Sequence, residues 1–190
     1  MDAVPFGLLL VLVRTSWGPL HRIDFDTDFD TAAALHRYIN GHHAQVKLWM
    51  SITTVGGPTV LRIAAFIAAV VVWFRGARRS AVLIAATMAG AALLSGITKV
   101  LVARVRPVLT DPVDHASGGS FPSGHALTSC VAMGLLLVTV SPLIAQRRWR
   151  VALTGVAVLV VVLVGFSRLI LGVHYLSDVI GGWLAGVAWL

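Results

Sequence analysis

Long apolar runs make up most of the chain, and short polar clusters separate them. Crossing a bilayer as a helix takes about 20 apolar residues. Five runs are long enough, or nearly so: residues 58–74, 81–103, 126–145, 151–166 and 173–190. A sixth run, 4–13, is short and would span only with help from neighbouring helices or from residues before Met1. The pattern predicts an all-α polytopic membrane protein: a bundle of about six transmembrane helices.

Composition agrees with this prediction. Hydrophobic residues make up 57% of the 190 positions and charged residues only 12%, which excludes an ordinary soluble domain. The net charge of +7 does not indicate nucleic-acid binding, because the basic residues stand at the ends of apolar runs. The lone Cys130 lies inside such a run, so no internal disulfide is expected. The start of the chain lacks the basic segment and cleavage site of a secretory signal.

Two short loops carry arginine clusters and predict the orientation. They are the loops that follow the runs 58–74 and 126–145, with Arg75, Arg78 and Arg79 in the first and Arg147, Arg148 and Arg150 in the second. By the positive-inside rule both loops face the cytoplasm. The chain is treated as one domain over 1–190, and its short first helix and abrupt end suggest trimming at both ends.

The first long loop contains four alternating aspartates between residues 24 and 30. A calcium loop of the EF-hand type would need Gly and Glu where this chain has Phe29 and Leu35, so calcium is not expected. We instead predict a short interfacial helix in the first extracytoplasmic loop, capped by Asp30 or Thr31. The nearby histidines have no acid or cysteine at ligand spacing and are interpreted as solvated side chains: His36, His42 and His43.

Three polar islands interrupt the apolar chain, at residues 99–107, 121–126 and 167–178. In the predicted topology all three fall at the same membrane face, the extracytoplasmic one. A charged residue at the bilayer centre costs on the order of 3 kcal/mol, less near the interface, and usually marks a site with partners. Arg104 alone is interpreted as a side chain that snorkels to the lipid headgroups.

The islands contain the parts of a phosphate-binding site. Lys99, Arg106 and Arg168 supply three cations, with only Asp178 as a nearby acid. Arginine forks match phosphate oxygens, and lysine adds a point charge. Ser123 and Gly124 stand at the start of a predicted helix, where free backbone N–H groups and the helix dipole bind anions.

Two histidines complete the candidate chemistry. His174 and Asp178 are four residues apart, so they share a face of a predicted helix. A carboxylate that accepts one ring N–H leaves the other ring nitrogen free to attack, which makes His174 the candidate nucleophile. His125 directly follows Gly124 and is the candidate general acid for the leaving oxygen.

These motifs resemble the type 2 phosphatidic acid phosphatase family, whose site is shared with vanadium haloperoxidases. The family pattern is K-x6-RP, then PSGH, then SR-x5-H-x3-D, and every spacing is matched here between Lys99 and Asp178. The resemblance implies an extracytoplasmic site with Lys99, Arg106 and Arg168 on the phosphate beside Ser123 and Gly124. It implies a phosphohistidine on His174 oriented by Asp178, His125 as acid and then base, and no metal or cofactor.

The expected activity is metal-independent hydrolysis of the terminal phosphate of a membrane lipid phosphate or diphosphate, in a membrane expected to be the bacterial plasma membrane. The alternatives are a lipid phosphotransferase with the same phosphohistidine, a vanadate-dependent peroxidase and a non-catalytic lipid-binding protein. Phosphatidic acid, phosphatidylglycerol phosphate and polyprenyl diphosphates all present the same end group, so the lipid stays open. The oligomeric state stays open too.

Overall fold

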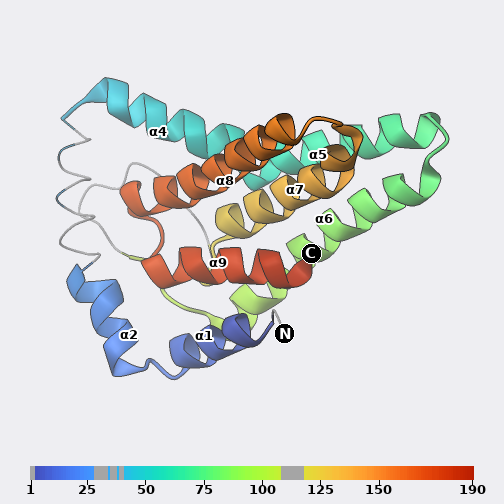
Figure 1. Ribbon diagram of the computed structural model, residues 1–190. Helices are drawn as coiled ribbons and strands as arrows, with labels where there is room; N and C mark the ends of the chain where they lie inside the picture. The colour runs from blue at the N-terminus through green and yellow to red at the C-terminus, as the bar shows by residue number, and fades with distance from the viewer. Residues whose placement is uncertain (1–2, 28–33, 35–37, 39–40, 108–117) are drawn as a thin grey trace.

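The computed structural model describes residues 3–27, 34, 38, 41–107 and 118–190. Within these residues the chain forms helices and no strand. The elements are α1 (Val4–Arg14), α2 (Gly18–Arg22), the π-turn η1 (Ile23–Thr27), α4 (His43–Val55), α5 (Pro58–Phe74), α6 (Arg78–Val102), α7 (Gly124–Val140), the 3-10 turn η2 (Ser141–Leu143), α8 (Arg147–Ile170) and α9 (Leu176–Trp189). Figure 1 shows α5 to α9 as an elongated bundle, with α1 lying alongside α9.

Four helical stretches are long and apolar enough to cross a membrane: His43–Phe74, Arg78–Val102, Gly124–Leu143 and Arg147–Ile170. The first and last predicted runs also form helices, α1 and α9, but these have only 11 and 14 residues. An all-helical architecture with apolar membrane-length helices is therefore confirmed in the described part of the chain, whereas the count of six spans stays a prediction. Asp30 and Thr31, the predicted caps of the interfacial helix, lie outside the described residues.

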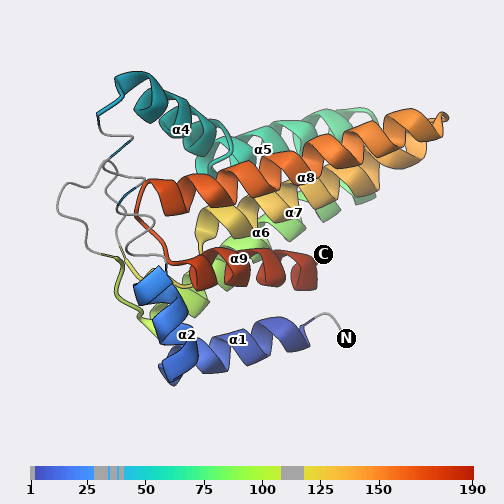
Figure 2. The ribbon, with the colours of Figure 1, turned by 60° about the vertical axis from the view of Figure 1, so that its left-hand side comes forward.

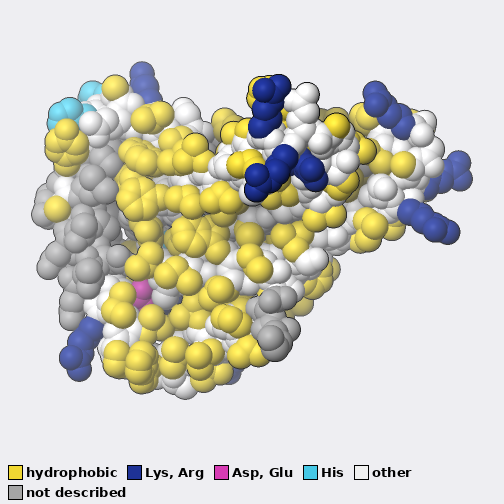
Figure 3. All heavy atoms as spheres, viewed as in Figure 1, with side chains coloured by type: hydrophobic (Ala, Val, Ile, Leu, Met, Phe, Trp, Pro, Cys, Tyr) yellow, Lys and Arg dark blue, Asp and Glu magenta, His cyan; other side chains and the backbone are white. Residues whose placement is uncertain are grey.

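Large apolar side chains cover much of the exterior. Phe66, Phe74 and Val100 are 67%, 83% and 79% exposed, and hydrophobic atoms spread over most of the surface seen in Figure 3. A soluble monomer rarely exposes a contiguous apolar patch of more than a few hundred Å². The outer faces of these helices are therefore suited to lipid contact.

Helix α4 was not predicted, and it continues almost directly into α5. The two form one stretch of 32 residues that is interrupted at Gly56 and Gly57. A Cβ atom at Gly56 would lie 2.1 Å from Cγ2 of Val164, so α8 packs directly against this break. A glycine at position 56 leaves room for this close approach. The approach keeps α4 beside α8, and Thr53 of α4 therefore lies next to the candidate site.

Helix α7 occupies the middle of the bundle and packs closely on α9. A Cβ at Gly182 would come 2.7 Å from the Ser123 carbonyl oxygen, and one at Gly186 would come 2.7 Å from Cβ of Cys130. The absence of these side chains lets the two backbones approach. The core around this contact consists of Met88, Ala91, Leu127, Val131 and Ala185. This packing brings the first turns of α7 and α9 together.

The two ends of the bundle differ in charge. The turns that join α5 to α6 and α7 to α8 lie at the same end (Figures 1 and 2), and Lys and Arg side chains gather there in Figure 3. The opposite end holds the C-terminus of α6, the N-termini of α7 and α9, and α2. The predicted site residues lie at this second end.

Candidate active site

Four helix ends position the predicted site residues. Lys99 lies in the last turn of α6, Ser123 is the N-cap of α7, and Arg168 lies in the last turn of α8. Asp178 lies in the first turn of α9. The backbone N–H of Ser123 donates to the Asp178 carbonyl oxygen at 2.9 Å. The structure thus brings the three polar islands to one place.

The turn between α8 and α9 places His174 beside Asp178. Gly172 adopts a positive φ of 68°, which glycine tolerates without strain, and this ends α8. Helix α9 then starts at Leu176 and not at residue 173, because Asp178 Oδ2 accepts from the Tyr175 backbone N–H at 3.0 Å and so caps the helix. His174 therefore precedes the helix that was predicted to carry it, although it still contacts Asp178.

The ring of His174 is buried, with 2% of its side chain exposed. Its Nδ1 lies 3.3 Å from Asp178 Oδ2. A carboxylate only accepts, so Nδ1 carries the proton and Nε2 keeps its lone pair. Burial lowers the pKa of His174 to about 4; Asp178 opposes this effect, while Arg106 and Arg168 add to it. The ring is therefore neutral near pH 7, with a nucleophilic nitrogen available.

Arg106 lies directly over that nitrogen. Its NH1 is 3.1 Å from His174 Nε2 and donates to the Val173 carbonyl at 2.8 Å. Its Nε and NH2 donate to the carbonyls of Gly118 and Gly119 at 3.1 and 3.2 Å. The guanidinium is thus held against the backbone, with its charge beside the unprotonated nitrogen of His174.

Lys99 shares a backbone partner with Arg106. Its Nζ donates to the Gly119 carbonyl at 2.7 Å. The turn after α6 makes this pairing possible, because Ala103 takes a left-handed conformation with φ of 48° and sends the following residues back across the helix end. Two cations therefore converge on one carbonyl oxygen, whose two lone pairs accept from both.

Arg168 is buried, with only 2% of the residue exposed. Its NH1 donates to Oγ1 of Thr53, in α4, at 2.6 Å. Sequence reasoning missed Thr53, since it lies 115 positions from Arg168 in a segment interpreted as loop. Arg168, the third cation predicted for the site, is thus oriented by a residue of α4, the helix that was not predicted.

The N-terminus of α7 points its first turn at the same region. Ser123 is fully buried, and its Oγ accepts from the Ala126 N–H at 3.5 Å as an N-cap. Gly124 and His125 follow as the first two helical residues, where backbone N–H groups have no intrahelical partner. A Cβ at Gly57 would lie 3.3 Å from His125 Nε2, so the break between α4 and α5 makes room for this ring.

The interpretation of Arg104 as a snorkelling side chain was wrong. Its NH1 donates to Asp178 Oδ1 at 2.7 Å, and its NH2 donates to Asp24 Oδ2 at 2.7 Å. Burial alone would lower the pKa of Arg104, but Asp178 and Asp24 outweigh burial and raise it. Asp178 is therefore not the only acid near the site. Asp24 was missed because the aspartate run was considered only as a calcium loop and as the start of an interfacial helix.

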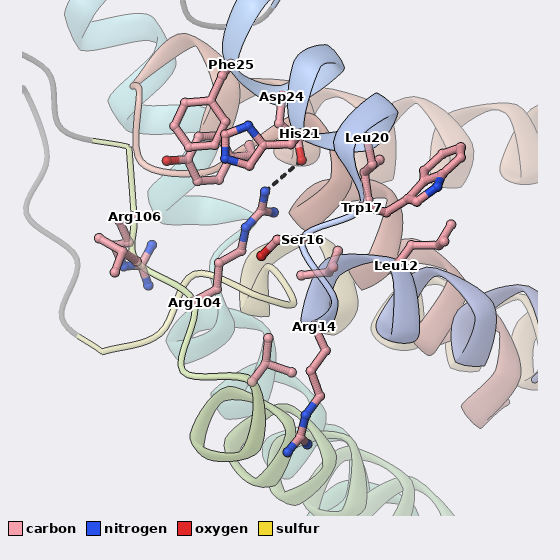
Figure 4. A pocket seen from close by; sticks show the side chains of 14 residues that line it. Leu12, Arg14, Ser16, Trp17, Leu20, His21, Asp24, Phe25, Arg104 and Arg106 are labelled. Carbon is pink, nitrogen blue, oxygen red and sulfur yellow. Dashed lines mark hydrogen bonds and ion pairs between the residues drawn. The ribbon is translucent and has the colours of Figure 1, made fainter.

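A cavity of about 690 Å³ lies beside Arg104 and Arg106. Figure 4 shows Arg104 crossing from the segment after α6 towards Asp24, with Arg106 on one side and Trp17 on the other. Apolar side chains of α1 and α2, such as Leu12 and Leu20, line the rest of the cavity. The site end of the bundle is therefore adjacent to an apolar hollow.

No group of three or more His, Cys, Asp or Glu in the described residues is arranged to hold a metal ion. His42 and His43 stand at the start of α4 and are exposed, whereas His36 lies outside the described residues. Within that part of the chain, the site offers cations, backbone N–H groups, two histidines and the carboxylates of Asp178 and Asp24 as its chemical groups.

Comparison with known families agrees with this geometry. The family model described as "PAP2 superfamily" matches residues 80–190, more than half of the chain and all three polar islands. The chain belongs to the PAP2 superfamily. The match includes Lys99, the two histidines and Asp178, so the site residues predicted from the motifs all lie in the segment that carries the PAP2 assignment.

Two curated proteins are similar in sequence. The chain is 39% identical over 98 residues to "Phosphatidylglycerophosphatase B" of Bacillus subtilis (strain 168), covering 50% of this chain and 47% of that protein. It is 31% identical over 133 residues to "Undecaprenyl-diphosphatase" of Sulfolobus acidocaldarius, covering 65% and 58%. The chain thus matches about half the length of these PAP2 relatives.

A solved structure shares the fold. The "Crystal structure of the first transmembrane PAP2 type phosphatidylglycerolphosphate phosphatase from Bacillus subtilis" superposes with a TM-score of 0.76, covering 99% of this chain and 92% of that one. The two sequences are 22% identical, so the likeness concerns the fold. It agrees with the membrane-length helices found here.

Proposed function

We propose that this chain hydrolyses the terminal phosphate of a membrane lipid phosphate or diphosphate through a phosphohistidine on His174. The observation that carries the proposal is the buried His174–Asp178 pair with Arg106 against Nε2 at 3.1 Å. A neutral imidazole whose free nitrogen faces a guanidinium is ready to meet a phosphate that the guanidinium binds. The names of the relatives, a phosphatidylglycerophosphatase and an undecaprenyl-diphosphatase, support the substrate class.

In the first step the phosphate takes the place of the contact between Arg106 and His174. Its oxygens are bound by Lys99, Arg106 and Arg168 and by the first N–H groups of α7. The lone pair of His174 Nε2 forms a bond to phosphorus, and the bond from phosphorus to the lipid oxygen breaks. His125 gives its proton to that oxygen, so the lipid leaves as a neutral alcohol, or as a monophosphate from a diphosphate.

In the second step water replaces the lipid. His125, now neutral, takes a proton from the water as its oxygen attacks phosphorus. The bond between phosphorus and Nε2 breaks, inorganic phosphate leaves, and both histidines return to their starting state. Asp178 keeps the proton on Nδ1 throughout and stabilises the charge that the ring carries while it is phosphorylated. No metal takes part in this sequence.

The proposed site faces the extracytoplasmic side, because the arginine-rich turns lie at the opposite end of the bundle. Single cysteines at Ser16 and at Gln146, in a chain with Cys130 replaced by Ala, test this in intact cells. An impermeant thiol reagent should label the cysteine at position 16, which lies at the site end, and not the one at position 146. The reverse pattern would place the site in the cytoplasm.

The activity itself is tested with the full chain purified in detergent. We expect phosphate release from at least one member of a panel of phosphatidic acid, phosphatidylglycerol phosphate and polyprenyl diphosphate, and no release by His174→Ala. A second lipid alcohol added during turnover should not collect the phosphate. Transfer to that lipid in place of release would make the protein a phosphotransferase, and turnover by His174→Ala would refute the proposed nucleophile.

A further inference from the structure

Arg104 joins two buried carboxylates that come from distant parts of the sequence. One arm of the guanidinium, NH1, donates to Asp178 Oδ1 and to Ser177 Oγ, both at 2.7 Å. The other arm, NH2, donates to Asp24 Oδ2 at 2.7 Å, the contact drawn in Figure 4. Both carboxylates are 0% exposed, and Arg104 is 15% exposed. Three charged groups are therefore held together out of water, where ion pairs are strongest.

We propose that Arg104 and Asp24 are positioning residues for the His174–Asp178 pair. They hold the Asp178 carboxylate in one orientation and set the negative charge that it presents to His174. The inference rests on the proposed function, because it takes His174 as the nucleophile. Arg104 occupies an unspecified position of K-x6-RP and Asp24 lies outside all three motifs, and no hydrogen bond or ion pair joins either residue to His174 within the described residues.

The orientation follows from how the oxygens of Asp178 are divided. Oδ1 accepts from Arg104, with Ser120 Oγ a more distant donor at 3.5 Å. Oδ2 accepts from His174 Nδ1 and from the Tyr175 N–H. Because both oxygens of the carboxylate accept hydrogen bonds, the group cannot rotate without breaking the hydrogen bonds of each oxygen. The Arg104 contact thus keeps Oδ2 directed at the imidazole.

Asp24 holds Arg104 in place and ties η1 to the start of α9. Its Oδ1 accepts from the Ser177 backbone N–H at 3.1 Å, and its Oδ2 accepts from Ser177 Oγ at 2.6 Å. This N–H belongs to the first turn of α9, where a negative charge is favourable. The ring of Tyr175 lies against the guanidinium of Arg104, whose central carbon is 4.3 Å from the ring centre. Asp24 therefore anchors the arm of the guanidinium that does not contact Asp178.

The three charges also act together. Arg104, Asp24 and Asp178 carry one net negative charge. If Arg104 were neutral, two unpaired carboxylates would remain close together, which raises the pKa of one of them and favours the protonated form of His174. If Asp24 were neutral, the guanidinium would cancel Asp178 entirely, and His174 would protonate less readily. The two single neutralisations should therefore have opposite effects on the pH at which His174 stops acting.

Other charged and titratable groups face His174 as well. They are Arg106 from the segment after α6, Arg168 from α8 and His125 from α7. All three are the same in every variant used below, and the ionisation of the substrate is common to all of them too. Differences between variants therefore report the charge on the Arg104–Asp24 pair.

The test measures kcat/KM for phosphate release from a lipid phosphate as a function of pH. The quantity compared is the acid limb of this profile, the pH range in which kcat/KM falls as the pH is lowered. Arg104→Gln should move the limb upward by about one pH unit and lower kcat/KM near neutral pH by about 10²-fold, the cost of a misplaced catalytic group. Asp24→Asn should move the limb downward. The double variant restores the net charge of the wild type, and its limb should return to the wild-type position.

Two further variants separate charge from geometry. Arg104→Lys keeps the charge but cannot fork between two carboxylates, so its limb should stay in place while kcat/KM falls. Arg22→Gln removes an exposed positive charge two residues from Asp24 and should change neither quantity. A merely structural role would lower activity and leave the limb in place. That result, or equal shifts in the two single variants, would overturn the proposal.

The result is distinguishable from a failure of the proposed function. If His174 is not the phosphorylated residue, His174→Ala still releases phosphate and the mechanism itself is wrong. If His174 is phosphorylated and the limbs of Arg104→Gln and Asp24→Asn coincide with that of the wild type, only the positioning role is wrong. Detergent-solubilised variants that elute as the wild type does on gel filtration are folded well enough for the comparison.

Discussion

The low pKa of His174 makes a quantitative prediction. The ring is buried, and burial lowers its pKa to about 4 against the effect of Asp178. At about pH 5.5 a group with a pKa of about 4 is roughly 97% neutral, whereas an ordinary histidine with a pKa of about 6.5 is only about 9% neutral. The nucleophile of the free protein should therefore remain available at a pH where a solvent-exposed histidine has lost about nine tenths of its neutral form.

The direct assay is a titration of the protein with ¹⁵N-labelled histidine, followed by NMR in detergent micelles. The signal of His174 is identified by its absence from His174→Gln. We expect this signal to show a neutral ring with the proton on Nδ1 through about pH 5.5 and to change only as the pH falls towards 4. A titration midpoint near 6.5 would refute the reasoning, because the ring would then not be held neutral by its surroundings.

The same shift predicts how stability depends on pH. In the unfolded chain His174 takes up its proton near pH 6.5, but in the folded protein it does so only near 4. The folded state is therefore disfavoured as the pH falls from 6.5 to 4, by on the order of 3 kcal/mol in total. His174→Gln has no such group, so its melting temperature should fall less than that of the wild type over this range.

Three other predictions follow from the site. His125→Ala should lose roughly 10²–10⁴-fold in the first turnover of a lipid phosphate but little in the burst of nitrophenol from nitrophenyl phosphate, whose leaving oxygen needs no proton; equal losses on both would remove His125 as the acid. Thr53→Val should lower kcat/KM about 10- to 100-fold, because it removes a hydrogen bond from the charged Arg168, while the exposed neighbour variant Thr54→Val should not. Orthovanadate should inhibit as a mimic of the transition state and EDTA should not; activity lost in EDTA and restored by a divalent ion would contradict the metal-free mechanism.

The helices were predictable because lipid-facing and buried positions both select apolar residues, so each span is a continuous run. The run predicted over 58–74 coincides with α5. Helix α4 escaped notice because polar residues such as His43, Lys47 and Thr53 mark it as loop in a search for apolar runs. The start of α9 was placed too early, at residue 173, because the apolar pattern already begins there. The helix starts only at Leu176, where the Asp178 side chain caps it.

The motif residues were predictable because their spacing within three short segments carries the chemistry. The partners that orient them were not. Arg104 and Asp24 lie 80 positions apart, and Thr53 and Arg168 lie 115 apart, and no local pattern links residues so distant. The buried position of Asp24 could not be predicted for the same reason, because it depends on the packing of η1 against α9.

The central claim is a covalent bond between phosphorus and His174 Nε2. The most direct measurement uses a lipid phosphate with a ³²P-labelled terminal group, a rapid quench and recovery of the full chain. The account predicts label that is stable in alkali and lost in acid, as a phosphohistidine is, mapped to the peptide that carries His174 and absent from His174→Ala. Label that is stable in acid and lost in alkali would indicate a phosphoester on a serine or threonine. That result, or turnover without any labelled protein, would contradict the account.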